Sequence, residues 1–391
     1  MSNDESHSRY DGSLTADHSY LGLTDEHALN FPPFTILPNK TKIECPLLAS
    51  RFCLYPGEIL PIITDDGDAI NVLERVRTSE NGYCFHLCRE SPFDTNLYGV
   101  LLQLTHFRAD ADEISVFAKL KALQIFYFTE GVRLQAYGIE VFVFNLKVSG
   151  EAIKEEISNL MINACDPKWL YQQSQTFEIP RNMLRFLTNH NWDTLKAKIF
   201  RYYLSIGMDE NFAKTKLEED PAFVSYYLIS NVPMTLKEKQ SLYVESVESR
   251  ITYCIDNLVA RFIRISCNRH NCLLAKNGDF IFVSHAGLCQ LFVNPAGFYF
   301  YVVTVKSNHL ALGTSENTWY PNYNWGYLLC DCTRHHGWGY SSFTSEPKMF
   351  ACIHFKSCNI VRFPVMNQSE YPPFETRELR ERDWIVRYDG Y

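Results

Sequence analysis

Hydrophobic and polar residues alternate along two stretches in the first half of the chain. In residues 113–128, one face carries Ile114, Val116, Ala118, Leu120 and Ala122. A second alternation covers residues 139–148, and Glu80-Asn81-Gly82 fits a hairpin turn. Because a period of two over such lengths is typical of half-buried strands, we predict a β-rich barrel or twisted sheet over residues 41–150.

The periodicity changes to that of helices between residues 151 and 260. Thr235 and Glu238 have the spacing of a capping box, and Pro180 suits the start of an earlier helix. Beyond the capping box, apolar residues recur at intervals of three and four, at Tyr243, Val247, Ile251, Cys254, Ile255 and Leu258. This pattern predicts about four or five helices that pack against the first β domain.

Short strand-like runs return in residues 261–366, separated by turns of Pro, Gly and Asn. Residues 1–40 and 367–391 are polar or charged, and we expect a disordered N-terminal tail and, at the other end, a C-terminal tail or a docking strand. The predicted fold class is α+β multidomain, with a β-rich domain, a helical bundle and an all-β domain. Apolar runs of about 18 residues are lacking, so we expect no contact with a membrane.

Charge and cysteine content limit the partners and the cellular compartment that we expect. The formal net charge is −8, from 37 Lys and Arg residues against 45 Asp and Glu residues. An acidic chain is a poor ligand for a phosphate backbone, so we expect no nucleic acid partner. Thirteen Cys residues and a polar N-terminus without the apolar core of a signal peptide indicate a reducing compartment.

Enzyme motifs are missing from the sequence. We find no GxxxxGK[ST] phosphate loop, GxGxxG turn, HExxH zinc motif or GxSxG nucleophile elbow. Catalytic groups are assembled in space, so this observation alone excludes little. It favours a non-catalytic protein.

Tryptophan is concentrated in the stretch SENTWYPNYNWGYLLCDCTRHHGWGY, which contains Trp319, Trp325 and Trp338. Glycines beside an aromatic residue let the backbone approach closely. Three indoles around one point would form an apolar box for flat rings or cations. The alternative is that these residues belong to the core of a small β domain. Their spacing excludes a single helical face but not core packing.

Cysteine pairs in the same region have the layout of a structural zinc site. Cys267 and Cys272 lie in CNRHNC, and Cys330 and Cys332 lie in CDC. The spacing departs from two CxxC knuckles, and His270 offers a CxxH alternative. We predict Zn²⁺ bound by the four Cys residues, and the alternative is a set of buried thiols without metal.

These motifs resemble the cereblon family. NTWYPNYNW, followed by Cys330 and HHGWGY, is similar to the family's thalidomide-binding (CULT) domain, a β-tent, and VNPAGFYF resembles a strand turn of that domain. The block from Pro46 to Val148, with LYPGEILPI, resembles the family's Lon-protease N-terminal-like domain. The order of a Lon-like domain, helices and a CULT domain covers roughly residues 45–360.

The resemblance implies a substrate receptor of a cullin-RING ubiquitin ligase in the cytoplasm and nucleus, with a damaged-DNA-binding adaptor protein and ubiquitination substrates as partners. The ligands would be cyclic imides, held between Trp319, Trp325 and Trp338. By position, Tyr340 stands where the family has Phe, and Asn294 matches the Asn at the cage rim. Asn317 replaces the family's His, and imide hydrogen bonds would use backbone groups near Asn317 and Trp319.

Two further hypotheses stay open. A CULT module without ligase coupling would read a cyclic or cationic small ligand, since cations are attracted to indole faces. An enzyme resembling methionine sulfoxide reductases would need an exposed thiolate of low pKa.

Overall fold

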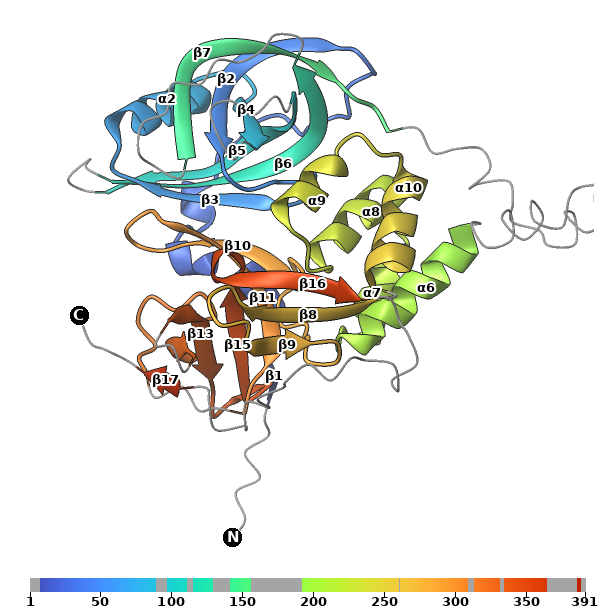
Figure 1. Cartoon of the computed structure of the whole chain (residues 1–391). Coiled ribbons are helices and arrows are strands. Elements are labelled where there is room, and N and C mark those ends of the chain that lie inside the picture. Colours follow the sequence, from blue (N-terminus) through green and yellow to red (C-terminus); the bar gives the residue numbers. More distant parts are fainter. Residues whose placement is uncertain are drawn as a thin grey trace, which may run out of the picture.

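The computed structural model describes residues 8–88, 97–110, 115–128, 141–155, 192–259, 261–308, 313–330, 334–363 and 385–387. In these residues a β barrel is followed along the chain by a group of helices and then by two further sheets (Figure 1). The helices lie beside both the barrel and the C-terminal sheets. The predicted α+β class is therefore confirmed.

The barrel has six strands in the order β3-β6-β5-β4-β2-β7, and an additional pairing of β6 with β7 closes it. Its strands are β2 (Lys42–Ser50), β3 (Ile59–Thr64), β4 (Tyr83–Cys88), β5 (Tyr98–Ala109), β6 (Val116–Phe128) and β7 (Val141–Ala152). On β6, the predicted inward residues Val116, Ala118, Leu120 and Ala122 are buried. Ile114 lies outside the described residues.

A helix that the sequence reading missed interrupts the barrel strands. Helix α2 (Gly67–Arg77) begins after Asp66, whose carboxylate accepts hydrogen bonds from the backbone of Asp68 and Ala69. The Glu80-Asn81-Gly82 turn therefore joins α2 to β4, and the prediction of a hairpin there is wrong. The acidic cap starts the helix in a stretch that reads as a polar turn.

The helical segment contains five α-helices in the described residues. They are α6 (Trp192–Ser205), α7 (Glu210–Leu217), α8 (Pro221–Ser230), α9 (Leu236–Ser241) and α10 (Val247–Thr252), and α10 continues into the π-helical turn η3 (Tyr253–Val259). The capping box is confirmed, because Glu238 N–H donates to the Thr235 hydroxyl and Thr235 N–H donates to the Glu238 carboxylate. Pro180 lies outside the described residues. No described helix is long and apolar enough to cross a membrane.

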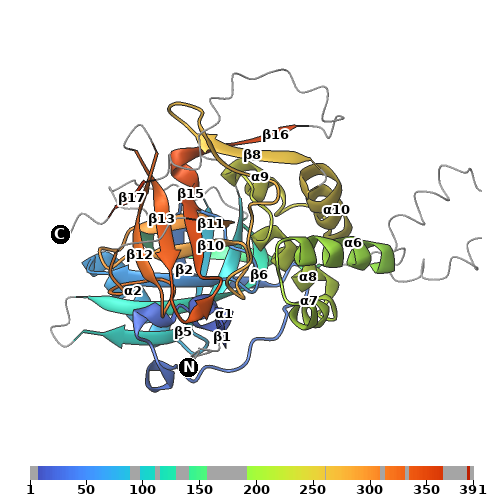
Figure 2. The ribbon, with the colours of Figure 1, turned by 90° about the horizontal axis from the view of Figure 1, so that it is seen from below.

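The C-terminal part folds into two sheets, which Figure 2 shows from below. The six-stranded sheet has the order β10-β11-β15-β13-β12-β17, and the three-stranded sheet the order β16-β8-β9. The larger sheet contains β10 (Cys289–Val293), β11 (Tyr299–Lys306), β12 (Asn324–Leu329), β13 (His335–Ser341), β15 (Met349–His354) and β17 (Ile385–Arg387). The smaller contains β8 (Phe262–Cys267), β9 (Leu273–Lys276) and β16 (Cys358–Phe363), the last preceded by η4 (Phe355–Ser357).

The N-terminal segment differs from the expected tail, whereas the C-terminal segment contains the docking strand that is the alternative to a tail. The N-terminal segment forms β1 (Ser8–Arg9), α1 (Gly12–Ala16), η1 (Ser19–Leu21) and η2 (Asp25–His27), and β1 pairs with β14 (Ser345–Glu346). Tyr10, Thr15 and His18 in it are buried. At the other end, β17 pairs with β12. The pairing of β1 with β14 depends on residues far away in the sequence, so local polarity concealed it.

The β10–β11 hairpin joins the larger C-terminal sheet to the barrel. Leu291, Val293 and Tyr299 share a hydrophobic cluster with barrel residues such as Leu60 and Leu104. Apolar burial of this kind stabilises by about 25 cal/mol per Å². The turn that carries Asn294 is thereby held against a rigid neighbour.

Candidate functional site

The aromatic residues singled out in the sequence come from β12, β13 and the loop before them. Trp325 lies in β12, Trp338 and Tyr340 lie in β13, and Trp319 precedes β12. In the antiparallel pairing, Trp325 stands opposite Tyr340, and Tyr327 stands opposite Trp338. Because opposite residues of a ladder share a face, one face of this hairpin is aromatic.

Trp319 and Trp338 meet in a corner. Their ring centroids lie 4.6 Å apart with planes at 65°. Phe292 stacks flat on Trp319 at 4.7 Å, and the ring of Phe300 contacts Trp319 at 5.6 Å and Trp338 at 4.8 Å. Two indoles and two phenyl rings thus define the corner. The sequence reading did not select Phe292, which directly precedes the VNPAGFYF stretch, or Phe300, which ends it, as site residues.

Trp325 lies at the margin of this aromatic cluster and is partly buried. Its indole Nε1 donates a hydrogen bond to the Glu316 carbonyl at 2.8 Å. Its backbone N–H donates to the Thr314 carbonyl at 2.9 Å, and its ring lies edge-on to Tyr327 at 5.6 Å. The loop before β12 therefore fixes the indole.

Tyr340 is a buried support of the sheet. It is 2% exposed, stacks on Phe350 at 5.0 Å and contacts the ring of Tyr320 edge-on at 4.8 Å. Burial raises the pKa of the Tyr340 hydroxyl well above its ordinary value. The hydroxyl therefore stays protonated, and the ring packs beneath the neighbouring aromatic residues.

The two candidate asparagines flank Trp319. The Oδ1 of Asn294 accepts a hydrogen bond from Phe298 N–H at 2.8 Å, and the adjacent Val293 carbonyl accepts from the Trp319 indole at 3.2 Å. Asn317 is exposed, with the positive φ of 54° that Asn tolerates. No hydrogen bond within the described residues uses the Asn317 carbonyl or the Trp319 amide.

The N-terminal segment packs behind this corner. The Thr15 hydroxyl donates to the Trp319 carbonyl at 3.2 Å and lies 2.6 Å from the Tyr10 hydroxyl. The Tyr20 hydroxyl accepts from Val293 N–H at 3.2 Å. The corner is thus supported by a segment about 300 positions away in the sequence, which no local signal could have revealed.

Replacing Thr15 by Val keeps the side-chain shape and removes both hydrogen bonds. We expect the free energy of unfolding to fall by about 1–2 kcal/mol, because buried groups on Trp319 and Tyr10 lose a partner. Urea denaturation followed by tryptophan fluorescence measures this change. Thr78→Val removes a hydroxyl bond on an exposed helix end and is the control; equal losses in the two variants would contradict a role for the buried position.

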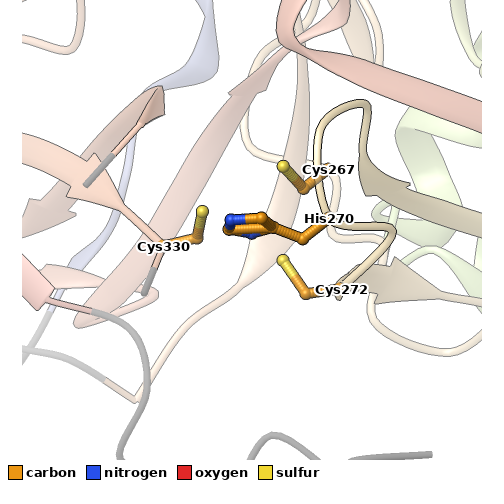
Figure 3. A group of neighbouring side chains, drawn as sticks. All are labelled: Cys267, His270, Cys272 and Cys330. Carbon is orange, nitrogen blue, oxygen red and sulfur yellow. The ribbon is translucent and has the colours of Figure 1, made fainter. Parts of the chain in front are cut away.

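A second group of side chains joins the two C-terminal sheets. Cys267 ends β8, His270 and Cys272 lie in the turn between β8 and β9, and Cys330 follows β12. Their ligand atoms all lie within 4.8 Å of one another. In Figure 3 the ring of His270 lies between Cys330 on one side and Cys267 and Cys272 on the other. Cys332 lies outside the described residues.

The electrostatics of this group suit a cation. Burial and the charge of Cys267 raise the pKa of Cys272, because neighbouring thiolates repel each other. The sulfur of Cys267 accepts a hydrogen bond from Arg269 N–H at 3.3 Å. Three thiols and an imidazole are a donor set that Zn²⁺ prefers.

His336 touches this group from outside. Its Nε2 lies 3.1 Å from the Cys330 sulfur, and its Nδ1 lies 3.2 Å from the Ser357 hydroxyl. The side chain is fully buried, and burial together with the charge of Arg334 lowers the pKa of His336 to about 4. The imidazole is therefore neutral at pH 7. The sequence reading did not single out His336.

Comparison with known proteins finds relatives that are named protein cereblon. Protein cereblon of Drosophila willistoni is 25% identical over 368 residues, covering 88% of this chain and 58% of the relative. Protein cereblon of Drosophila grimshawi is 23% identical over 95% of this chain and 58% of the relative. The chain thus spans less than two thirds of the length of these relatives. The resemblance to cereblon is confirmed.

Structural comparison finds Lon N-terminal domains at low similarity. The domain of the Mycobacterium avium complex Lon protease has 14% identity and a TM-score of 0.30, over 55% of this chain and 97% of that one. A Lon N-terminal domain protein of Xanthomonas campestris has 15% identity and a TM-score of 0.33, over 55% and 99%. No family model matches the chain.

Proposed function

We propose that this cereblon-like protein is a non-catalytic substrate receptor of a cullin-RING ubiquitin ligase, and that it recognises cyclic imides beside Trp319, Trp325 and Trp338. The corner of Trp319 and Trp338 is the observation that carries the proposal. By the resemblance to cereblon, the barrel and helices would bind the damaged-DNA-binding adaptor. The complex would promote ubiquitination and proteasomal degradation of substrates in the cytoplasm and nucleus.

The chemistry of the corner supports an imide ligand. A glutarimide-like ring would lay its methylene groups against the indoles, at about 0.8 kcal/mol for each buried methylene. Its N–H and carbonyl groups would need partners, because an unpaired buried polar group costs about 1–3 kcal/mol. The Asn317 carbonyl can accept from the imide N–H, and the Trp319 amide can donate to an imide carbonyl.

Titration with a fluorescent thalidomide analogue tests the ligand. We expect saturable binding to the wild type and at least tenfold weaker binding to Trp338→Ala, since tenfold corresponds to about 1.4 kcal/mol and an aromatic wall contributes that much. Trp192→Phe, which alters an indole at the start of α6, is the matched control and should bind normally. Equal binding by Trp338→Ala and the wild type would contradict the proposal.

A competition experiment distinguishes imides from the alternative ligand class, which is small cations. A cation is attracted to the faces of aromatic rings such as those of Trp319, Trp338 and Phe300 by about 0.5–2 kcal/mol. If a quaternary ammonium ion displaces the imide analogue at a lower concentration than unlabelled imide does, the result would favour a protein that binds cationic ligands. Stronger competition by the unlabelled imide supports the proposal.

Affinity purification from source cells tests the ligase partner independently. A tagged chain should recover the adaptor protein and cullin, and Trp338→Ala should recover them equally, because the proposed adaptor surface lies on the barrel and helices. Imide binding without recovery of any ligase component would leave a ligand-binding module. We further propose that Zn²⁺ at the cysteine group is structural and ties the two C-terminal sheets together.

A further inference from the structure

We infer that a cavity between the end of α6 and the larger C-terminal sheet binds an extended peptide segment that carries an apolar side chain and an acidic residue. The segment adds its backbone to the edge of residues 280–282. None of the residues that line this cavity belongs to the corner of Trp319 and Trp338. The inference therefore goes beyond the proposed function and does not depend on it.

The cavity has the size and the lining of a ligand pocket. Its volume is about 550 Å³, within the range of about 300–1,000 Å³ that is typical of ligand sites. Its apolar lining consists of Leu204, Ile206, Phe280, Ile281, Phe282 and Pro347. Leu204, in the last turn of α6, is 41% exposed. The cavity therefore offers apolar surface that a ligand side chain can cover.

One wall of the cavity is the edge of an extended segment. Phe280 stands opposite Val305 of β11 in an isolated antiparallel bridge. The hydrogen bonds beside this pair join the residues on either side of each partner, at 3.2 and 2.7 Å. In an antiparallel ladder, this pattern turns the N–H and carbonyl of the central residue away from the partner strand. The Phe280 N–H and carbonyl therefore point away from β11.

This edge faces the turn after α6 and has an unpaired residue. Phe282, on the same edge, donates its N–H to the Ile206 carbonyl at 2.7 Å. Within the described residues, no hydrogen bond uses the Phe280 N–H or carbonyl. A donor and an acceptor on one edge residue are the groups with which an extended peptide pairs when it adds a strand. The edge therefore favours a peptide over a small acid, which has no matching donor and acceptor.

Lys306 gives the cavity a preference for an acidic residue. Its side chain is exposed, its Nζ donates to a backbone carbonyl at 2.8 Å, and it forms no ion pair with any described residue. Arg9 also lines the cavity, but it is paired with Asp209 at 2.9 Å. The Glu346 carboxylate accepts a hydrogen bond from a backbone N–H of its own turn at 3.2 Å. Lys306 therefore has two N–H groups left for a carboxylate of the peptide.

Fluorescence anisotropy with the fluorescein-labelled peptide TEVLVET tests the mode of binding. We expect saturable binding by the full chain. Two further peptides carry one backbone N-methyl group each, on the leucine or on the valine that follows it. Because alternate N–H groups of a strand face the edge, one N-methyl peptide should bind about tenfold more weakly and the other nearly as well as the parent. Equal effects of the two methyl groups would overturn the inference, as would the absence of saturable binding. Competition by N-acetyl-leucine as strong as that by the unlabelled peptide would also overturn it, because the pocket would then bind a small acid.

Reciprocal charge exchange tests the residues of the cavity. Lys306→Glu should weaken binding of TEVLVET about fivefold and strengthen binding of the lysine counterpart TKVLVKT. Lys276→Glu changes an exposed lysine of β9 and is the matched control. Leu204→Ser should weaken both peptides, because it removes apolar surface without changing charge. A Lys306→Glu variant that does not alter the preference between the two peptides would contradict the site. All three variants should bind the thalidomide analogue normally, so failure here is distinct from failure of the proposed function.

Discussion

A Gly337→Ala variant is expected to lose about 4 kcal/mol or more of its free energy of unfolding, a loss in the exceptional range for one substitution. Gly337 lies in β13 directly before Trp338, with a φ of 152°. A β-carbon placed there would lie 1.8 Å from the Cys352 carbonyl oxygen and 2.9 Å from its carbon. These are backbone atoms of the paired strand β15, so β13 and β15 would have to separate.

Gly278→Ala separates the steric clash from the cost of backbone conformation. Gly278 has a φ of 90° and no atom within 4 Å of the added β-carbon. That variant should lose only about 1–2 kcal/mol, the cost of a left-handed conformation for a residue with a side chain. Urea denaturation of both variants measures the difference. Similar losses in the two would show that the close approach of the strands does not limit stability.

Features that depend on a few neighbouring residues could be predicted from the sequence. The capping box at Thr235 was predictable because it involves only Glu238, three residues further on. Strand β6 was predictable because the alternation lies within its own sequence. The concentration of tryptophan residues was also visible in the sequence, but the antiparallel pairing that places Trp325 and Trp338 on adjacent strands was not predicted.

Features made by residues distant in sequence could not be predicted. Thr15 meets Trp319 only after the N-terminal segment crosses the C-terminal sheet. Phe300 lies within VNPAGFYF, but its contact with Trp338 arises because β11, β15 and β13 are neighbours in one sheet. Helix α2 was missed for another reason, because its Asp66 cap follows an acidic residue and precedes Gly67, a combination that also suits a turn.

Acidification from pH 7 to pH 5 is expected to lower the free energy of unfolding by roughly 2 kcal/mol for each of two buried histidines. Burial lowers the pKa of His86 to about 3 in the folded chain, and burial with the charge of Lys119 does the same for His18. An unfolded histidine titrates near 6.5. Between these values the unfolded chain binds more protons, so stability is present above pH 6.5 and is lost as the pH falls towards 3.

The surroundings of His86 explain why its charged form is excluded. Its Nε2 lies 2.7 Å from the Ser50 hydroxyl, its ring stacks on Phe52, and its Nδ1 has no hydrogen-bond partner within the described residues. A second proton would therefore place an unpaired N–H and a charge in an apolar site. His86→Gln removes this group and should reduce the slope of stability against pH by about 1.4 kcal/mol per pH unit, measured by urea denaturation at a series of pH values. His27→Gln changes a partly exposed histidine in η2 and is the control. Because the slope is compared rather than the absolute stability, a less stable His86→Gln variant still tests the idea, and a slope equal to that of the wild type would contradict it.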